Sequence, residues 1–439
     1  MTRAPRFRHG VHPPDSKTLT EGLPVRRMPY PAEVVLPLQQ HAGRPAKLVV
    51  ELDQRVERGD VLAEADGHVS VPIHASASGT VVDVGLSPHP SGAWEPAVRI
   101  AVDADSAQAA RPRLVPHWEQ LSPEQIVQAV KDAGVVGLGG AAFPTHVKLA
   151  PPPGTRLEAL LVNGCECEPY LTTDHRTMVD HPERVQLGVR ILMRCLGVER
   201  AMIGVERNKP DAIEALQATL PDDLDVTVLP LTVKYPQGAE KMLIKAVTGR
   251  EVPSGKLPLD AGVLVQNVAS LATIAEVFET GLPLVERVVT VTGGGIVEPK
   301  NLLVPIGTKL RDLFAACGGT TFDAKQIVMG GPMMGPSQSN LDTPIVKGVT
   351  GVVVLQGADV KPQETFDCIK CGHCLDACPI FLNPQRLGLL AKNTRYEDMQ
   401  EDYHLNDCML CGCCSYVCPS NIPLSHLFGA SKAALRSRS

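Results

Sequence analysis

The sequence predicts a multidomain chain of α/β and β structure that ends in a helical, metal-binding module. Short β-type runs broken by glycine, aspartate and proline fill residues 32–105. Strand-like and helical patterns then alternate over residues 122–281, and two groups of cysteines lie near the C-terminal end. At 439 residues the chain is long enough for several cores, because single cores rarely grow beyond a few hundred residues.

The composition is that of a globular protein without the bulk charge of a nucleic-acid binder. Hydrophobic residues make up 44% and charged residues 21% of the chain, and the formal net charge is -6. We therefore expect no nucleic-acid partner. Basic residues are denser at the two ends, around Arg3, Arg6 and Arg436. They indicate solvated tails or, alternatively, docking on a partner or an anionic membrane surface.

No segment predicts a membrane span. The first residues lack the apolar stretch of a targeting signal. The longest apolar candidate, residues 261–278, contains Gln266, Asn267 and Glu276. A span needs about 20 mostly apolar residues, and charge at depth is costly. Any membrane association is therefore expected to be peripheral.

The N-terminal part divides into a lead-in and a β domain. Residues 1–31, rich in proline and basic residues, are expected to be extended. Within 32–105 the strand-like runs are 46–52, 69–73, 79–85 and 97–102. The segments 56–62 and 75–81 resemble the biotinyl/lipoyl barrel-sandwich domains, which display a modified lysine at a hairpin tip. Residues 64–78 contain no lysine, so this barrel-sandwich domain is expected to be structural and non-carrying.

The middle of the chain predicts an α/β domain over 115–281. Ser122 and Pro123 read as a helix N-cap and first helical position. Strand-like runs at 157–163, 200–205, 225–231 and 262–267 alternate with helical patterns, which indicates a mainly parallel sheet.

A second β-rich stretch occupies residues 285–358. It has strand-like runs at 287–292, 301–305 and 326–329 and a turn from Gly330 to Gly335. It resembles a soluble-ligand-binding β-grasp (SLBB-like) domain. Pro362 and Gln363 then mark a linker into the cysteine-rich end, residues 359–439.

The cysteines indicate metal ligation in a reducing cytoplasm rather than a disulfide framework. Two runs share the spacing C-x2-C-x2-C-x3-C-P, which wraps three corners of a [4Fe–4S] cubane and directs the fourth ligand to the other cluster. The expected sets are Cys368, Cys371, Cys374 and Cys418 for one cluster, and Cys408, Cys411, Cys414 and Cys378 for the other.

Zinc is the alternative occupant of these cysteines. Zinc ribbons, however, use paired C-x2-C units rather than a four-cysteine run that ends in proline. Cys413 lies between two expected ligands, and we interpret it as a small buried residue near the sulfurs. The C-terminal module is thus expected to be a ferredoxin-like α-helical domain with two [4Fe–4S] clusters, which makes the chain an electron-transfer protein.

A glycine loop from Gly137 to Ala142 fits the pattern G-x-G-x-x-A. The pattern alone is weak, because a Rossmann fingerprint follows a strand directly and this loop follows an expected helix. The loop is interpreted as a phosphate- or ring-binding turn, with Lys148 adding positive charge, or alternatively as a simple tight turn.

The surroundings of this loop resemble the NADH- and FMN-binding flavoprotein subunit of respiratory complex I. The resemblance rests on the loop with Phe143 and Lys148, on the segment 163–169, on 235–240 and on 265–268. It implies that Phe143 and Glu168 face NADH. It also implies that FMN is lined by Gly137, Gly139, Gly140, Lys148, Asn163, Glu166, Gly238, Glu240, Gln266 and Asn267.

Three positions depart from that family. Cys165 stands where the family has aspartate, Ala239 where it has glutamate, and Gln266 where it has asparagine. Cys165 and Cys167 are interpreted as ordinary buried thiols.

The order of the modules is similar to that of the C subunit of the Rnf electron-transport complex. The segment from His12 to Lys17 and the lysine-less barrel-sandwich domain precede the flavin domain, and the two-cluster domain follows. The resemblance implies a peripheral subunit on the cytoplasmic face of the cell inner membrane. Its partners would be other Rnf subunits (membrane and iron–sulfur/flavin subunits), NADH and, indirectly, ferredoxin.

The resemblance also implies an activity: NADH:ferredoxin oxidoreductase coupled to ion translocation. Nicotinamide and FMN would exchange hydride, and single electrons would pass through the clusters to partner subunits. No general acid–base residue is expected. Two alternatives stay open, a soluble FMN/iron–sulfur cobalamin reductase and a docking subunit whose flavin site is inactive.

Overall fold

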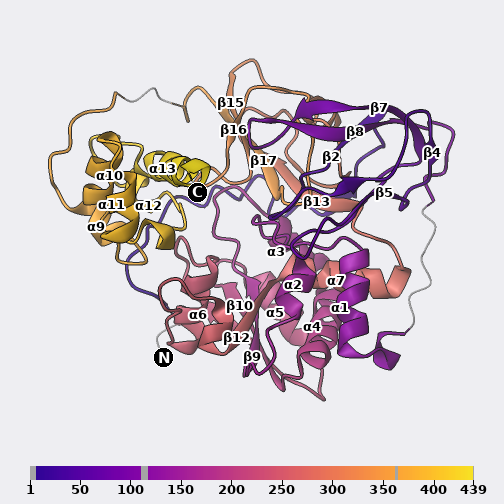
Figure 1. Ribbon diagram of the computed structural model, residues 1–439, viewed down its shortest axis with the longest axis horizontal. Helices are drawn as coiled ribbons and strands as arrows, with labels where there is room; N and C mark the ends of the chain where they lie inside the picture. The colour runs from indigo at the N-terminus through magenta and orange to yellow at the C-terminus, as the bar shows by residue number, and fades with distance from the viewer. Residues whose placement is uncertain (1–5, 110–116, 361–363, 439) are drawn as a thin grey trace.

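The computed structural model describes residues 6–109, 117–360 and 364–438. Its central domain contains a four-stranded sheet in the order β11-β10-β9-β12 (Figure 1). All three strand pairs are parallel, which confirms the expected α/β layout. The strands are β9 (Ala159–Gly164), β10 (Arg200–Glu206), β11 (Asp225–Leu231) and β12 (Val263–Asn267).

Helices cover both faces of this sheet. Leu160 and Val162 of β9 point into a core shared with one set of helices, whereas Leu161 points to the opposite face. This alternation is what a buried strand with period two produces. The first face carries α1 (Pro123–Asp132), α4 (Pro182–Leu196), α5 (Pro210–Ala218) and α7 (Val268–Thr280), and the second carries α6 (Glu240–Thr248).

Helix α1 begins where its sequence predicts. The Ser122 hydroxyl accepts from the Gln125 backbone N–H at 3.3 Å, and the Gln125 side chain accepts from the Ser122 N–H at 2.8 Å. This reciprocal capping box satisfies two of the N–H groups that a helix start leaves unpaired.

The N-terminal domain consists of two small antiparallel sheets packed on one core. Two of the expected runs shrink, because only Lys47–Leu48 and Ile73–His74 pair as strands. The sheet orders are β2-β8-β7-β4 and β3-β5-β6. The strands are β2 (Glu33–Pro37), β3 (Lys47–Leu48), β4 (Arg55–Val56), β5 (Val61–Glu64), β6 (Ile73–His74), β7 (Gly79–Pro88) and β8 (Trp94–Val102).

The third domain is a six-stranded sheet in the order β1-β14-β13-β17-β15-β16. Strand β1 (Val25–Arg27) comes from the lead-in and pairs parallel with β14, so this part of the lead-in belongs to the third sheet. The other strands are β13 (Glu286–Thr292), β14 (Lys300–Pro305), β15 (Ala324–Met329), β16 (Ser337–Gln338) and β17 (Gly351–Gln356), and α8 (Leu310–Ala316) packs on them.

The C-terminal domain is helical and lies beside α6 and the third domain (Figure 1). The last helix is not a solvated tail: the Lys432 ammonium donates to the Cys408 carbonyl at 2.6 Å, and Arg438 pairs with Glu397. Arg3, Pro362 and Gln363 lie outside the described residues. The helices are α9 (His373–Ala377), α10 (Pro384–Lys392), α11 (Tyr396–Glu401), α12 (Cys413–Tyr416) and α13 (Leu424–Arg438).

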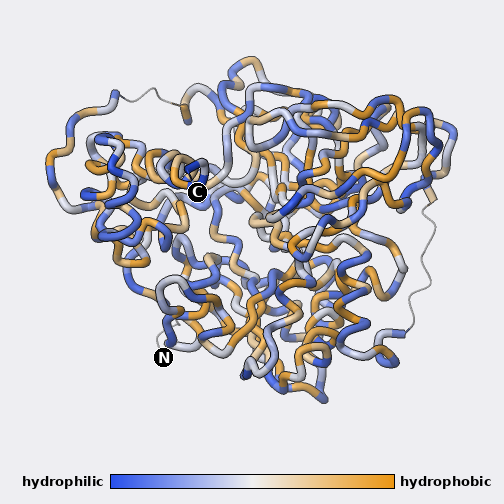
Figure 2. The backbone as a smooth tube through the Cα atoms, viewed as in Figure 1, coloured by the Kyte–Doolittle hydropathy of each residue, from blue (hydrophilic) through white to orange (hydrophobic). Residues whose placement is uncertain are grey.

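Hydrophobic and hydrophilic residues alternate along the helices in Figure 2. Within residues 6–109, 117–360 and 364–438, no helix combines the length and the apolar character that crossing a bilayer requires.

Candidate functional site

The glycine loop leaves α1 as a closed backbone turn with one open edge. The Gly137 N–H donates to the Phe143 carbonyl at 2.8 Å, and the Ala142 N–H donates to the Gly137 carbonyl at 3.2 Å. Gly140 has φ +111° and no atom within 4 Å of the place where a Cβ would stand. Only glycine adopts this conformation without strain, and the exposed backbone there is free to approach a ligand closely.

Lys148 lies beside this loop in α2 (Thr145–Leu149). Its ammonium pairs with the Glu240 carboxylate at the start of α6 and donates to the Val265 carbonyl at 3.3 Å. Both side chains remain about one third exposed, at 28% and 34%. The structure therefore brings two of the expected cofactor residues together at the edge of the sheet.

Three amide side chains meet at the carboxyl ends of β9 and β12. Asn163 donates to the Gly238 carbonyl at 2.8 Å. Asn267 caps α7 by accepting from the Ala269 N–H at 2.9 Å, and a Cβ on Gly139 would stand 3.2 Å from its Nδ2. The buried Gln266 amide nitrogen has no hydrogen-bond partner among the described residues. Ligands of open α/β sheets bind at this edge, and an unpaired donor there fits a polar ligand.

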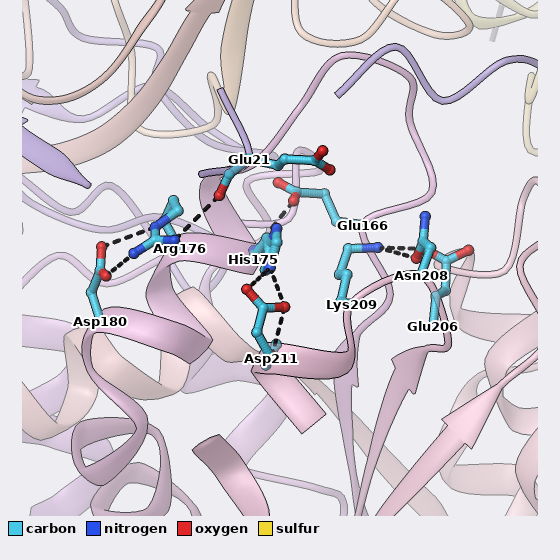
Figure 3. Close-up of polar contacts among 10 residues, drawn as sticks. Glu21, Glu166, His175, Arg176, Asp180, Glu206, Asn208, Lys209 and Asp211 are labelled. Atoms are coloured by element: carbon cyan, nitrogen blue, oxygen red, sulfur yellow. Dashed lines mark hydrogen bonds and ion pairs between the residues drawn. The ribbon is translucent and has the colours of Figure 1, made fainter. Parts of the chain in front are cut away.

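Glu166, which is expected to line the FMN, makes contacts that the sequence analysis did not predict. Its buried carboxylate accepts from the Thr173 hydroxyl at 2.9 Å and from the Asp174 and His175 N–H groups, so it caps α3 (Thr173–Asp180; Figure 3). Burial acts to raise its pKa, but the charges of Lys17 and Lys209 and the helix N–H groups outweigh burial and lower the pKa. It orients α3 under the site.

Lys17 and Lys209 are buried cations that the sequence analysis did not assign. Lys209 pairs with Glu206 at 3.0 Å (Figure 3). Lys17 comes from the lead-in and donates to the carbonyls of Glu168, at 2.9 Å, and Leu171. A lysine that is only 3% exposed in the middle of the lead-in indicates that this segment packs against the central domain rather than forming a tail.

Glu168 lies against the third domain. Its carboxylate accepts from the Met333 N–H at 3.1 Å, and a Cβ on Gly331 would come within 2.3 Å of it. Burial raises its pKa to about 7. The Glu168 carboxylate thus lies between the turn at 330–335 and Tyr235. Phe143, the other residue expected to face NADH, lies in the glycine loop.

Cys165 and Cys167 are held as neutral thiols. Burial raises the pKa of both. The Cys165 thiol donates to the Gly204 carbonyl at 3.4 Å, and Cys167 accepts from the Gly238 N–H at 3.2 Å. Their surroundings are those of structural cysteines, as expected.

Asp174 is a further residue of the site that the sequence analysis missed. It accepts from the Asn267 Nδ2 at 2.7 Å, and its second oxygen has no partner among the described residues. Burial and the Glu166 carboxylate raise its pKa to about 7. A run of polar residues soon after the β9 strand was the available signal.

This raised pKa predicts a pH-dependent cost in stability. The unfolded state ionises Asp174 at lower pH than the folded state, so stability falls as pH rises from the ordinary value of 3.8 toward 7. We expect Asp174→Asn to raise the melting temperature more at about pH 8 than at about pH 5.5. The exposed Asp222→Asn is the control. An advantage that stays constant across this range would contradict the prediction.

Four cysteines from both runs line one cavity of the C-terminal domain: Cys378, Cys408, Cys411 and Cys414. The other four cysteines also lie near one another. The pKa of Cys374 is raised most by burial and then by the charges of Cys371, Cys368 and Cys418, which indicates that these thiols are close to it. The buried Cys413 lines the cavity as well. In each group the fourth cysteine comes from the other run, as a two-cluster fold requires.

Each of the two groups supplies four cysteine thiols, which is the number and kind of ligand that a [4Fe–4S] cluster takes. Among the residues that the structure describes, no three His, Cys, Asp or Glu side chains converge closely enough to hold one metal ion.

The cavity group lies against the central domain. The Tyr235 hydroxyl donates to the Cys411 carbonyl at 2.8 Å. The Asp407 carboxylate, beside Cys408, accepts from the Gly255 N–H at 3.3 Å and pairs with Lys241 of α6 at 3.4 Å. In the other group, Cys368 and Cys371 are exposed.

Family models match the four domains in order. A barrel-sandwich hybrid domain of RnfC matches residues 5–105, and the Nuo51 FMN-binding domain matches 130–276. An SLBB domain matches 288–337, and a 4Fe-4S dicluster domain matches 364–422. These matches confirm the four expected modules.

Curated relatives match almost the whole chain. The C subunit of the proton-translocating ferredoxin:NAD(+) oxidoreductase complex of Clostridium ljungdahlii is 46% identical over 91% of this chain and 88% of its own. The chain belongs to the RnfC family. The RnfC relative from Acetobacterium woodii, which is part of a Na(+)-translocating complex, is 42% identical over 90% of this chain and 89% of its own. A Rhodobacter capsulatus RnfC relative is 41% identical over 87% and 74%.

A solved NAD+-reducing [NiFe]-hydrogenase shares the fold with this RnfC chain. It aligns with a TM-score of 0.53 at 20% identity, over 73% of this chain and 67% of that one. The RnfC cofactors are FMN and two [4Fe–4S] clusters, because the matching domains are an FMN-binding domain and a dicluster domain. The cobalamin reductase and the scaffold with an inactive flavin site are not favoured.

Proposed function

We propose that this chain is the NAD(H)-oxidising subunit of an ion-translocating ferredoxin:NAD+ oxidoreductase complex. The observation that supports it most is the near end-to-end match to the C subunits of such complexes, in a chain that joins an FMN-binding domain to a dicluster domain. FMN would exchange hydride with the nicotinamide and the clusters would carry single electrons.

The protein groups bind and position. The open backbone at Gly140 gives the flavin a close approach, with Gly137 and Gly139 in the same loop, and Lys148 supplies a cation at the same edge. The amide side chains of Asn163, Gln266 and Asn267 line the proposed FMN site at the carboxyl ends of β9 and β12. Glu166 supports the site indirectly, because its carboxylate caps α3. Phe143 and Glu168 remain the residues proposed for NADH. Gly238 and Glu240 complete the set, through Asn163 and Lys148 respectively.

The two cysteine groups have different places in this proposal. The group of Cys378, Cys408, Cys411 and Cys414 holds the cluster on the flavin side, which is supported by the bond from Tyr235 to the Cys411 carbonyl. The group of Cys368, Cys371, Cys374 and Cys418 holds the cluster on the partner side, which is supported by the exposure of Cys368 and Cys371.

The chain would work as a peripheral subunit on the cytoplasmic face of the inner membrane. Its partners would be the membrane and iron–sulfur/flavin subunits of the complex, with ferredoxin reached through them. Membership of a family whose relatives are named as parts of ion-translocating complexes supports this placement.

The experiment that tests the function is anaerobic reconstitution with FMN, iron and sulfide, followed by NADH. We expect NADH to bleach flavin and cluster absorbance. Unchanged absorbance would contradict the assigned activity. Reduction of cob(II)alamin by the same preparation would favour the reductase alternative, and equal bleaching by NADPH would contradict the nicotinamide specificity.

A further inference from the structure

The glycine loop is held from outside its own domain by a buried arginine. Arg287 lies on β13 of the third domain and is 4% exposed. Its Nη2 donates to the Leu138 carbonyl at 3.3 Å, and its Nη1 donates to the Lys347 carbonyl. Leu138 stands between Gly137 and Gly139, so the guanidinium binds the backbone of the loop itself.

Lys347 reaches the base of the same loop. It is 1% exposed and lies just before β17. Its ammonium donates to the Gly134 carbonyl at 2.7 Å and to the Pro72 carbonyl at 2.9 Å. Gly134 precedes the loop, and Pro72 lies in the N-terminal domain, within the lysine-free segment 64–78. The Lys347 side chain therefore connects the third domain to both the N-terminal domain and the central domain.

The backbone after Lys347 also touches the loop. A Cβ on Gly348 would stand 3.0 Å from the Ala142 Cβ and 3.3 Å from the Gly140 carbonyl oxygen. From the other side, the Ala42 N–H of the N-terminal domain donates to the Ala142 carbonyl at 3.1 Å. The loop is thus clamped between the first and third domains.

The two cations are costly to bury, and their contacts show what they stabilise. Among the described residues neither forms an ion pair, and both donate to backbone carbonyls, Arg287 also to that of Val288 at 3.2 Å. Burial lowers the pKa of Arg287 to about 10, with Asp174 opposing that shift, and lowers the pKa of Lys347 to about 7. An apolar side chain would avoid this cost, but it could not bind the loop carbonyls.

We propose that Arg287 and Lys347 are positioning residues for the FMN site, through which the β-grasp domain holds the glycine loop in its binding conformation. This rests on the proposed placement of FMN at Gly137–Gly140. The β-grasp domain is then part of the flavin site rather than a separate ligand-binding module. A loop that is already held in place loses less conformational entropy when FMN binds. Releasing the glycine loop from Arg287 or Lys347 should therefore weaken FMN binding.

The first test compares FMN dissociation constants, from quenching of flavin fluorescence, on the full chain with its clusters reconstituted. We expect Arg287→Met to weaken FMN binding about tenfold, as loss of a charged hydrogen bond to the loop implies. Arg58→Met is the matched control, because Arg58 is 7% exposed and binds Glu286 on the same strand at 2.7 Å. It should change FMN affinity less than about twofold.

The second test needs no loss of a buried charge. Gly348→Ala places a methyl group against the Ala142 Cβ, and we expect weaker FMN binding with an unchanged circular dichroism spectrum. Ala142 has φ +47°, so Ala142→Gly is tolerated there. The double variant Ala142→Gly/Gly348→Ala removes the closer of the two contacts and should bring FMN affinity back toward wild type, a rescue that a general loss of stability would not show.

The outcomes separate the two levels of the proposal. Wild-type affinity in both Arg287→Met and Gly348→Ala would overturn the positioning role and leave the flavin site intact. A wild-type chain that binds no FMN at the glycine loop would contradict the proposed function and this inference together. If Arg287→Met does not fold, the Gly348→Ala pair decides.

Discussion

Cys378→Ser is expected to remove the cluster of the second cysteine run while the cluster of its own run remains. Cys378 belongs to the first run in sequence, but it lines the cavity with Cys408, Cys411 and Cys414. Loss of one of four thiolate ligands removes the charge and the covalent anchor that hold a cubane. We expect about half of the iron and sulfide per chain, measured after anaerobic reconstitution.

The same variant tests the order of the clusters. If the cavity group lies on the flavin side, NADH should still bleach flavin in Cys378→Ser but should no longer reduce the remaining cluster rapidly. In Cys371→Ser, by contrast, the remaining cluster should still be reduced, because the altered group is the exposed one. Low-temperature EPR after rapid freezing distinguishes the two.

Cys413→Ser is the control for both variants. Cys413 begins α12, lines the same cavity as Cys378 and is fully buried at 0% exposure, but it is not an expected ligand. Both clusters should form in it. Loss of a cluster in Cys413→Ser, or loss of the first-run cluster in Cys378→Ser, would contradict the crossed ligand sets.

Lys148→Met is expected to weaken FMN binding by about 10- to 100-fold, the range for losing a charge-assisted hydrogen bond. The effect has a second part, because the variant leaves the Glu240 carboxylate without its cation at the same edge of the site. Lys148→Met/Glu240→Gln should therefore bind FMN more tightly than Lys148→Met alone. Fluorescence quenching of FMN provides the measurement.

Lys245→Ala is the matched control on α6. Lys245 also pairs with a carboxylate, Glu251, at 2.9 Å, and it is 37% exposed. Its loss should leave FMN affinity unchanged, since exposed pairs contribute little. Equal FMN affinity in Lys148→Met and wild type would contradict the role of Lys148 in the flavin site.

Local patterns were sufficient to predict most of the central domain. Its four strands begin and end within two residues of the expected positions, because buried strands carry continuous apolar runs between turn residues. The capping box at Ser122 is equally local. Six strands in the described part of the chain were missed. Strands β1, β4, β5 and β16 have two to four residues, which give too little periodicity to detect. Strands β2 and β17 are short, continuous apolar runs, which periodicity does not distinguish from a buried helix segment.

The residues of the candidate site also divide into those that a local pattern predicts and those that it does not. The glycine loop, Lys148 and the eight cysteines were predicted from spacing, since their chemistry depends on neighbours along the chain. Asp174, Lys17 and Arg287 were missed, because each acts on residues far away in sequence. The capping contacts of Glu166 were also not predicted, since only the folded chain shows its carboxylate at the start of α3.

By itself the sequence determined the order of the domains, the cluster-binding runs and the glycine loop, because these depend on short-range spacing. Only the tertiary structure decided which cysteine group faces the flavin domain and which is exposed. It also decided that the glycine loop is clamped by Arg287 and Lys347 of another domain. Contacts between distant segments follow from packing of whole domains, and no local pattern of residues encodes them.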